Sequence, residues 1–206
     1  MTQSLQPGMP ERADVTVLVP AAGRGERMGL GPKALLDLHG RPVVEWVVRK
    51  AMRIADEVIV ACPADSDPVL GEGCRWNRIT GGPTRQHSVR LLAHAATRPW
   101  VVVWDAARPF TAIELAQAVL AAAPLTGIAA AVLPDDVFQT PLAFKRGLQL
   151  DLVDRADREG WALRTTMELV QRAGPPFSRV DGDPLNIKLT TADDWALAQT
   201  LLGRLA

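Results

Sequence analysis

The amino-acid sequence predicts an α/β fold, a Rossmann-like, mostly parallel sheet flanked by helices on both faces. Short runs of β-branched residues alternate with longer segments rich in alanine and leucine, which is the order of strand–helix–strand units. The first run, VTVLVP at residues 15–20, is apolar throughout, as expected of a strand that is covered on both faces.

The other elements follow in the same alternation. Strands are expected at residues 15–20, 58–62, 100–104 and 128–133. Helices are expected at residues 43–54, 88–96, 113–123, about 145–156, about 166–173 and 192–205. Ligands of such sheets bind beyond the carboxyl ends of the strands, where the strand order reverses. The chemistry is therefore expected in the loops that begin at Pro20, Thr80, Asp105 and Pro134.

Length and charge bound the class of protein. Residues 1–14 are polar and contain two prolines, so a flexible N-terminal tail is expected there, followed by a single domain at residues 15–206. The tail lacks the apolar core of a signal peptide, and no apolar run approaches the ~18 residues that span a bilayer, so a cytoplasmic protein is expected. Because 23 Lys and Arg balance 23 Asp and Glu, the chain has no broad basic field for nucleic acid.

The loop after the first strand, PAAGRGERMGLGPK at residues 20–33, combines glycines with cations. Glycine lets backbone N–H groups approach phosphates closely, and Arg24, Arg27 and Lys33 add positive charge. Its glycines match neither the P-loop spacing nor the dinucleotide-binding spacing. The combination indicates a nucleoside triphosphate, although a solvated glycine turn with incidental charges would have the same composition.

AAGRGERMG, followed by PKALLDLHGRPVVEW, resembles the signature of the nucleotidyltransferases that activate sugars and sugar alcohols. The resemblance implies that the nucleotide site includes Ala21, Ala22 and Gly23. It also implies that Arg27 neutralises the β- and γ-phosphates and that Lys33 lies near the α-phosphate.

The stretch TGGPTRQHSV at residues 80–89 precedes an expected helix. Its GGxxRxxSV pattern resembles the cytidine-binding stretch of the 2-C-methyl-D-erythritol 4-phosphate cytidylyltransferase family. The resemblance implies that the backbone at Gly82 reads the pyrimidine edge and that Arg85 and Ser88 lie beside base and ribose. From the residues alone, Ser88 equally suits the N-cap of the helix, and His87 is expected at the surface.

Asp105, in WDAARPF at residues 104–110, comes directly after a buried strand. A carboxylate that faces a triphosphate there is a natural Mg²⁺ ligand, with a capping or ion-paired aspartate as the alternative. The stretch resembles the HDAARP motif of the same family, with Trp104 in place of the histidine. The resemblance implies that Asp105 binds a Mg²⁺ cofactor and that Arg108 lies on the sugar-phosphate side of the pocket.

PLNIKLTTADD, at residues 184–194, resembles the NIKxTxPEDL ending of the family. The resemblance implies that Lys188 is a second lysine at the α-phosphate. Thr191 and Asp193 precede the last helix and suit capping. The four matching stretches occur in the family's order and span about residues 17–200.

The sequence departs from the family at residues 132–144, VLPDDVFQTPLAF. Family members usually carry a long β-arm here, which packs across a two-fold partner and lends an arginine to the neighbouring acceptor site. In this chain the arm is largely missing, and Thr140 in the return segment matches a contact to the acceptor phosphate. We therefore expect a monomer or a weak homodimer, in which the acceptor phosphate loses a cation unless Arg108 or Lys145 compensates. Residues 154–161, DRADREGW, resemble part of the lost arm but follow the return segment, so a helix end and loop without a phosphate role is expected.

The resemblance implies transfer of CMP from CTP to 2-C-methyl-D-erythritol 4-phosphate. The products would be 4-diphosphocytidyl-2-C-methyl-D-erythritol, an intermediate of non-mevalonate isoprenoid precursor biosynthesis, and pyrophosphate. Two alternatives stay open. One is a cytidylyltransferase for another polyol phosphate, such as ribitol 5-phosphate, because acceptor choice lies in the shortened segment. The other is a non-catalytic nucleotide-binding homologue, although such a binder needs no pair of lysines at the α-phosphate.

Overall fold

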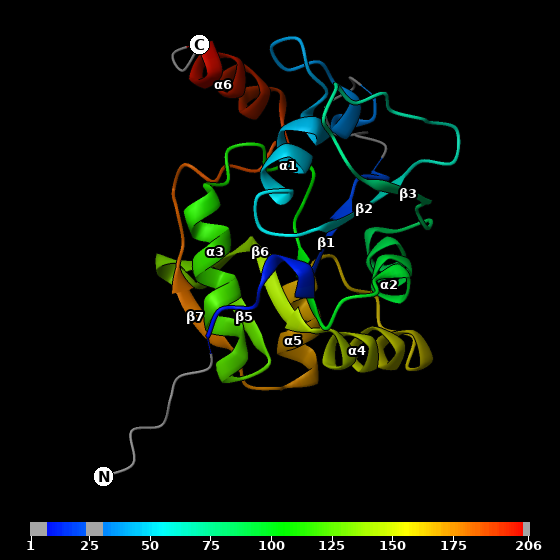
Figure 1. The fold of residues 1–206 in the computed structure, drawn as a ribbon, viewed down its shortest axis with the longest axis vertical. Helices are drawn as coiled ribbons and strands as arrows, with labels where there is room; N and C mark the ends of the chain where they lie inside the picture. The colour runs from blue at the N-terminus through cyan, green and yellow to red at the C-terminus, as the bar shows by residue number, and fades with distance from the viewer. Residues whose placement is uncertain (1–7, 24–30, 204–206) are drawn as a thin grey trace.

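The computed structural model describes residues 8–23 and 31–203, and within them seven strands form one sheet (Figure 1). The strands are β1 (Val15–Pro20), β2 (Glu57–Cys62), β3 (Asn77–Thr80), β4 (Trp100–Val103), β5 (Ile128–Leu133), β6 (Val137–Lys145) and β7 (Ser178–Asp181). Their order across the sheet is β3-β2-β1-β4-β6-β5-β7. β6 runs antiparallel to β4 and β5, and the other neighbouring pairs are parallel, so the predicted mostly parallel sheet is confirmed.

Helices cover both faces of the sheet. They are α1 (Val43–Ala51), α2 (Arg85–Ala95), α3 (Ile113–Ala122), α4 (Arg146–Arg158), α5 (Thr166–Ala173) and α6 (Ala192–Gly203). Val17 and Val19 of β1 point to the layer formed by α1 and α3, whereas Leu18 points to the layer formed by α2, α4 and α5. Because successive strand residues point to opposite faces, a strand between two helical layers must be apolar at nearly every position. Figure 1 shows α3 and α2 on opposite sides of the strands.

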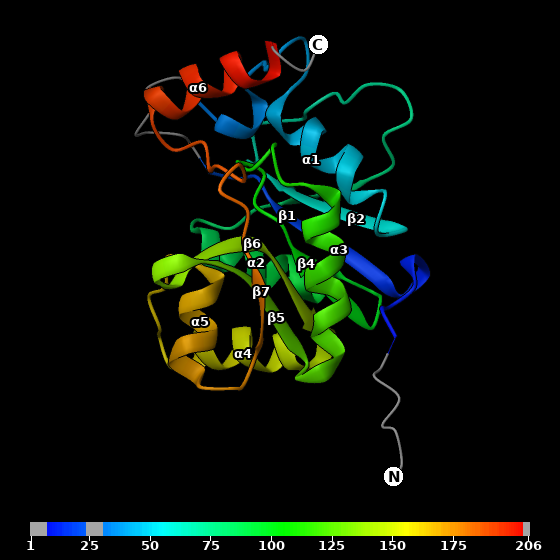
Figure 2. The same cartoon turned by 90° about the vertical axis from the view of Figure 1, so that its left-hand side faces the viewer.

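α6 belongs to neither layer. It packs through Ala198 against Leu38, Val43 and Leu189 in a small separate cluster. Figure 2 shows α6 beyond the end of the sheet, above α1. Since Leu189 is 1% exposed and lies next to Lys188 in the chain, this cluster fixes the segment that carries Lys188.

The structure confirms the four predicted strands and the six predicted helices, with helix ends that differ by a few residues. Three strands are missed by the sequence analysis. β3 and β7 are four-residue edge strands with largely exposed side chains, so they leave no apolar run in the sequence. β6 was expected only as a return segment, because Thr140 and Pro141 interrupt its apolar pattern.

The strand order determines where the site lies. The chain passes from β1 to β2 and β3 on one side, then returns to β4 on the other side of β1. The loops that follow β1 and β4 therefore leave the sheet side by side at the reversal of strand order, where ligands of such sheets bind.

Two expectations concern the chain as a whole. None of the helices within residues 8–23 and 31–203 combines the length and apolar character needed to cross a membrane. Of the expected tail, residues 8–14 are described, and they include a single 3₁₀ turn, Arg12–Asp14, that leads into β1.

Candidate active site

Asp105 is the centre of a buried charge cluster. Its side chain follows β4 and is only 8% exposed. Oδ1 accepts hydrogen bonds from Arg85 Nε at 3.0 Å and from Arg85 Nη2 at 2.6 Å, and Oδ2 accepts from Lys188 Nζ at 2.8 Å. Burial alone would raise the pKa of Asp105, but the positive charges and hydrogen bonds of Arg85 and Lys188 hold it well below its usual range. The cluster therefore has two cations around one carboxylate, a net positive charge.

Arg85 joins three elements at this point. It begins α2, contacts Asp105 after β4, and donates from Nη1 to Thr166 Oγ1, at the start of α5, at 3.0 Å. Thr165 caps α5 by accepting from Glu168 N at 3.0 Å. Thr166 is a site residue that the sequence analysis missed. It begins a predicted helix, and no charge or motif in its stretch marks it as a site residue.

A pocket of about 310 Å³ opens beside Asp105. Three cations, Arg85, Arg108 and Lys188, line it, together with Thr140 and Thr166. The structure thus brings together five positions from segments that are far apart in the sequence. A cationic pocket of this size at the strand reversal suits a small phosphorylated ligand.

Thr140 reaches the pocket because β6 is irregular. Ala130 of β5 pairs with Leu142, but Ala131 pairs with Gln139, so Thr140 and Pro141 stand outside the regular register. Bulges of this kind re-aim side chains next to active sites. Thr140 Oγ1 accepts a hydrogen bond from the backbone N–H of Asp105 at 3.2 Å.

Arg108 is held by the segment that precedes Lys188. Its side chain is largely buried, and Nη1 donates to the carbonyl oxygen of Asn186. Burial lowers the pKa of Arg108, yet a guanidinium remains charged in proteins. Its Nε has no hydrogen-bond partner among the described residues. Arg108 lines the same pocket as Asp105 and Thr140, and its place on the sugar-phosphate side stays a prediction.

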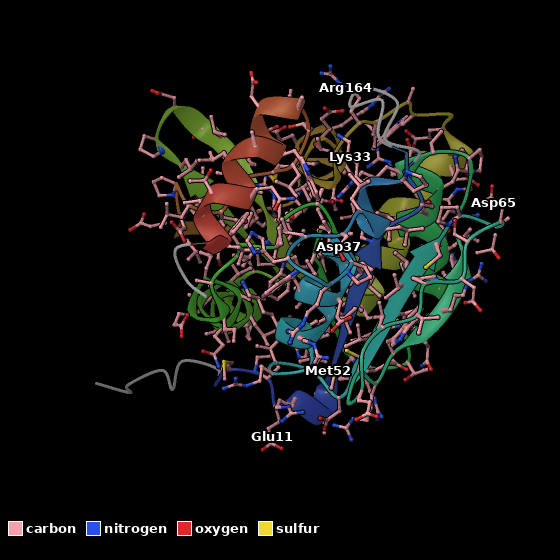
Figure 3. All side chains as sticks on the ribbon, turned by 90° about the horizontal axis from the view of Figure 1, so that it is seen from above. Glu11, Lys33, Asp37, Met52, Asp65 and Arg164 are labelled. Atoms are coloured by element: carbon pink, nitrogen blue, oxygen red, sulfur yellow. The ribbon has the colours of Figure 1, made fainter. Side chains whose placement is uncertain are left out.

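The two predicted lysines converge on one segment. Lys33 lies on a 3₁₀ turn and donates from Nζ to the carbonyl oxygens of Thr190 at 2.8 Å and Leu189 at 3.3 Å. Lys188 immediately precedes these two residues. Figure 3 shows Lys33 and Met52 at opposite sides of the molecule, and Met52 lies shortly before β2 in the chain. Arg27, the third predicted catalytic residue, lies outside the described residues.

The loops after β1 and β3 contact each other closely. A Cβ on Gly81 would lie 2.3 Å from Ala22 Cβ, and one on Gly82 would lie 2.4 Å from His87 Cβ. Both positions therefore need glycine for packing alone. The loop is braced by Ser88, whose Oγ accepts from Gly82 N at 3.1 Å and donates to a backbone carbonyl in the same loop at 3.0 Å. Ala21, Ala22 and Gly23, which follow β1, thus lie at the same edge of the sheet as Gly82 and Arg85.

Some expectations are corrected by the structure. The N-cap of α2 is Thr84, which accepts from His87 N at 3.2 Å, whereas Ser88 lies inside the helix; the surface position of His87 is confirmed. For α6, the carboxylate that accepts from the backbone N–H of Thr191 is Asp194, at 2.8 Å, rather than Asp193. Thr191 returns the contact by accepting from Asp194 N at 3.2 Å, so its predicted capping role is confirmed.

Lys145 cannot replace a cation at the acceptor phosphate. It pairs with Trp100, the first residue of β4, at the opposite edge of the sheet from Asp105. Five residues separate it from Thr140, which corresponds to roughly 17 Å along a strand. The segment from Asp154 is a helix end, as expected, and Asp154 accepts from Arg90 and His94 of α2 at 2.8 Å each.

The residues present fit a magnesium ion that arrives with a nucleotide. The described residues contain no group of three or more His, Cys, Asp or Glu side chains that could hold a metal alone. Asp105 offers one carboxylate at the pocket, and Mg²⁺ commonly takes one or two carboxylates while substrate phosphates supply further oxygens. Both oxygens of Asp105 are paired with cations, so one cation would turn toward the phosphates when the ion binds.

Helices on both faces of a mostly parallel sheet, with a cationic pocket at the strand reversal, define a fold of the α/β nucleotidyltransferase type. Within this class, the chain belongs to the 2-C-methyl-D-erythritol 4-phosphate cytidylyltransferase family, whose sequence model matches residues 15–138 and 136–204.

Known relatives agree with this assignment. The 2-C-methyl-D-erythritol 4-phosphate cytidylyltransferase of Thermus thermophilus is 38% identical over 209 residues, covering 91% of this chain and 97% of that protein. The protein of the same description from Deinococcus radiodurans is 38% identical, covering 90% and 88%. The crystal structure of the Thermus protein superimposes with a TM-score of 0.79 at 35% identity, covering 92% of this chain and 98% of that chain.

The comparisons also show that this chain is shorter than a relative. The family match is divided into two parts that overlap at residues 136–138, at the start of β6. The alignment with the Thermus protein extends over 209 positions but includes 91% of this chain, about 187 of its 206 residues. About 20 aligned positions of the relative therefore have no counterpart here. In this chain a short turn, Pro134–Asp136, connects β5 to β6 next to the point where the two matched parts overlap.

Proposed function

We propose that the chain transfers CMP from CTP to 2-C-methyl-D-erythritol 4-phosphate and releases pyrophosphate, with 4-diphosphocytidyl-2-C-methyl-D-erythritol as the product. The relatives at 38% identity carry this activity in their names and align over nine-tenths of the chain. The observation that carries the proposal is the pocket at Asp105, where Arg85, Arg108 and Lys188 meet. Three cations are what a triphosphate and a second phosphorylated substrate require in one place.

The reaction needs no activated nucleophile. An anionic oxygen of the acceptor phosphate attacks the α-phosphorus of CTP and forms a new P–O bond. The bond from the α-phosphorus to the oxygen that bridges to the β-phosphate breaks, and pyrophosphate leaves with that electron pair. Since a phosphate monoester is already charged near neutral pH, catalysis consists of positioning the substrates and neutralising the charge that builds up.

The described cations divide this work. Lys188 is released from Asp105 to reach an oxygen of the α-phosphate, and Lys33 approaches from the segment that follows Lys188. Arg108 and Thr140 hold the acceptor phosphate. Arg27, assigned from its sequence position, neutralises the leaving pyrophosphate.

Asp105 has a second role in this proposal, as the protein ligand of Mg²⁺. When bound, the ion would neutralise phosphate charge as a Lewis acid. The low pKa of Asp105 keeps its carboxylate ionised throughout the range in which the enzyme is expected to work. The dependence on Mg²⁺ is tested by adding EDTA and then excess Mg²⁺, which should stop and restore turnover.

We also propose that the chain is a cytoplasmic protein and a monomer or weak homodimer. The basis for the second statement is the short turn Pro134–Asp136 in the place of the family's arm. Light scattering at low micromolar concentration should give the mass of one chain, 22.2 kDa. A stable dimer at that concentration would contradict the proposal.

The proposed reaction is tested by following pyrophosphate release from CTP and Mg²⁺ in parallel with 2-C-methyl-D-erythritol 4-phosphate, with ribitol 5-phosphate and without acceptor. Release with methylerythritol phosphate alone supports the proposal. Release with ribitol phosphate alone would keep the chemistry and overturn the acceptor. No release with either acceptor, in a protein that still binds CTP, would identify a non-catalytic homologue.

A further inference from the structure

Three buried side chains behind the pocket form a continuous hydrogen-bonded chain. Trp104, Thr111 and Asn186 are each 0% exposed. Trp104 Nε1 donates to Thr111 Oγ1 at 3.1 Å, and Thr111 Oγ1 donates to Asn186 Oδ1 at 2.8 Å. Asn186 Nδ2 then donates to the backbone carbonyl of Thr140 at 2.8 Å. The chain links the segment after β4, the segment before α6 and the irregular part of β6.

The direction of this chain is fixed at both ends. An indole N–H can only donate and a backbone carbonyl can only accept. Thr111 therefore accepts from Trp104 and has a single proton to give, for which Asn186 Oδ1 at 2.8 Å and the carbonyl oxygen of Arg108 at 3.0 Å are the two acceptors. If the Asn186 amide were reversed, its oxygen would face the carbonyl of Thr140, and two acceptors would oppose each other. The donor at one end and the acceptor at the other thus select one orientation of the Asn186 amide.

The side chain and the backbone carbonyl of Asn186 each bind a residue that lines the pocket. Its side chain holds the backbone of Thr140, whose hydroxyl accepts from Asp105 N. Its backbone carbonyl accepts from Arg108 Nη1, and Lys188 follows two residues later. A rotation of the Asn186 side-chain amide would therefore release the backbone of Thr140, next to the segment whose backbone holds Arg108.

Lys50 fixes the same loop from the α1 side. Its ammonium donates to the carbonyl oxygens of Pro109 at 2.6 Å and Thr111 at 3.0 Å. Lys50 is half-buried, and this burial lowers its pKa. Lys50 therefore holds the backbone around Thr111, while the Thr111 hydroxyl contacts Trp104, Asn186 and the carbonyl oxygen of Arg108.

We propose that Trp104, Thr111 and Asn186 are positioning residues that set the acceptor side of the pocket through this directional relay. The inference rests on the proposed function, because it assigns Arg108 and Thr140 to the acceptor phosphate. Among the described residues, the side-chain hydrogen bonds of the relay reach neither Gly82 nor Ala21, Ala22 and Gly23, so the nucleotide side keeps its geometry without them. Loss of the relay raises KM for the acceptor and leaves KM for CTP unchanged.

Thr111→Val tests the relay, because it removes the hydroxyl while keeping the shape of the side chain. The matched control is Thr16→Val, since Thr16 is also 0% exposed and its hydroxyl donates to Glu57 at the opposite edge of the sheet. We expect Thr111→Val to raise KM for methylerythritol phosphate roughly tenfold, the scale of one buried hydrogen bond. KM for CTP should stay within about twofold of wild type. Thr16→Val should lower Tm without changing either KM.

Equal kinetics of the two variants, or an equal rise of both KM values in Thr111→Val, would overturn the positioning role. Trp104→Phe is the second variant in case Thr111→Val does not fold. It should raise KM for the acceptor and leave KM for CTP unchanged.

A test that does not depend on turnover is the NMR resonance of the Trp104 indole N–H, which is assigned by its loss in Trp104→Phe. It should exchange slowly in the wild type and shift in Thr111→Val. A Trp104 indole N–H that exchanges rapidly in the wild type and does not shift in Thr111→Val would contradict the relay. A wild-type enzyme without turnover would contradict the proposed function, and the Trp104 resonance would then decide whether the relay exists.

Discussion

The two halves of the sheet, on either side of the reversal between β1 and β4, are built differently. The nucleotide half, β1 to β3, contains parallel strands whose loops carry glycines and begin where each strand ends. The acceptor half, β6, β5 and β7, contains the antiparallel strand, a register shift and a turn in which Asp135 and Asp136 have positive φ. In the proposed function, the first half would bind CTP through close backbone approach, and the second would bind the acceptor through side chains on irregular backbone.

This structural difference between the two halves predicts which substrate a substitution affects. Close packing of Gly81 against Ala22 leaves no room for added atoms where the residues after β1 and β3 meet. In the acceptor half, Thr140 and Arg108 depend on Asn186, which contacts both from another segment. Substitutions in the first half should therefore act on CTP, and those in the second on the acceptor or on stability.

The largest effect is expected at the lysines that join the two halves. Lys33→Ala and Lys188→Ala should each lower kcat by ~10²-fold or more, the scale of one lost electrostatic contact to the transition state. Lys145→Ala, at the opposite edge of the sheet, is the matched control and should keep wild-type turnover. Steady-state rates at saturating substrates make the test, and near wild-type kcat in both lysine variants would refute their assignment.

Gly81→Ala should affect KM for CTP but not KM for the acceptor. The new Cβ would lie 2.3 Å from Ala22 Cβ, so the loops after β1 and β3 must move apart. We expect KM for CTP to rise by roughly tenfold with little change in KM for the acceptor, as for about 1.4 kcal/mol of lost binding. Gly147→Ala is the control, because in the described structure nothing lies within 4 Å of its added Cβ. If both KM values rose together, the division of the site would be wrong.

Two buried glutamines, Gln139 in β6 and Gln149 in the following helix α4, offer a test by stability. Gln149 is 0% exposed, and neither amide atom has a partner among the described residues. Gln139 is 4% exposed, but it donates to the carbonyl of Asp183 and accepts from its N–H at 3.0 Å each. Gln149→Met should stabilise the fold by about 1 kcal/mol, whereas Gln139→Met should destabilise it. Urea unfolding decides, and a similar loss of stability in both variants would contradict the contrast.

The smallest effect is expected in the turn that replaces the arm. Asp135 has φ 63°, which costs an L-residue energy that glycine avoids. Asp135→Gly should raise the free energy of unfolding by ~0.5–1 kcal/mol without changing either KM. Asp136→Gly is the comparison: it relieves a similar φ but removes the ion pair with Arg179, so its gain should be smaller. Thermal unfolding measures both, and destabilisation by Asp135→Gly would show that the turn is not strained there.

The nucleotide half was the easier one to predict from sequence. VTVLVP and the glycines that follow it are neighbours in the chain, so a local pattern contains both the strand and its loop. Arg85, Asp105 and Lys188 were each found from their own stretches, and the structure brings them into one cluster. The local signals were sufficient because each residue follows a strand or precedes a helix at the same edge of the sheet.

The acceptor half could be predicted only in part. Nothing near Asn186 in the sequence shows that it contacts Thr140 and Arg108, which are 46 and 78 residues away. Trp104 was noted as a departure from the family motif, but its hydrogen bond to Thr111 depends on how the loop after β4 folds. Contacts of this kind arise from tertiary packing, which periodicity and spacing do not encode.

The central claim is that this shortened family member uses CTP and 2-C-methyl-D-erythritol 4-phosphate. Its most direct test is a competition in one tube that contains the purified chain, CTP, Mg²⁺ and equal concentrations of methylerythritol phosphate and ribitol 5-phosphate, with the products resolved by mass spectrometry. The account predicts 4-diphosphocytidyl-2-C-methyl-D-erythritol as the main product, accompanied by pyrophosphate. A predominance of the cytidylylated ribitol, or of free CMP, would contradict it.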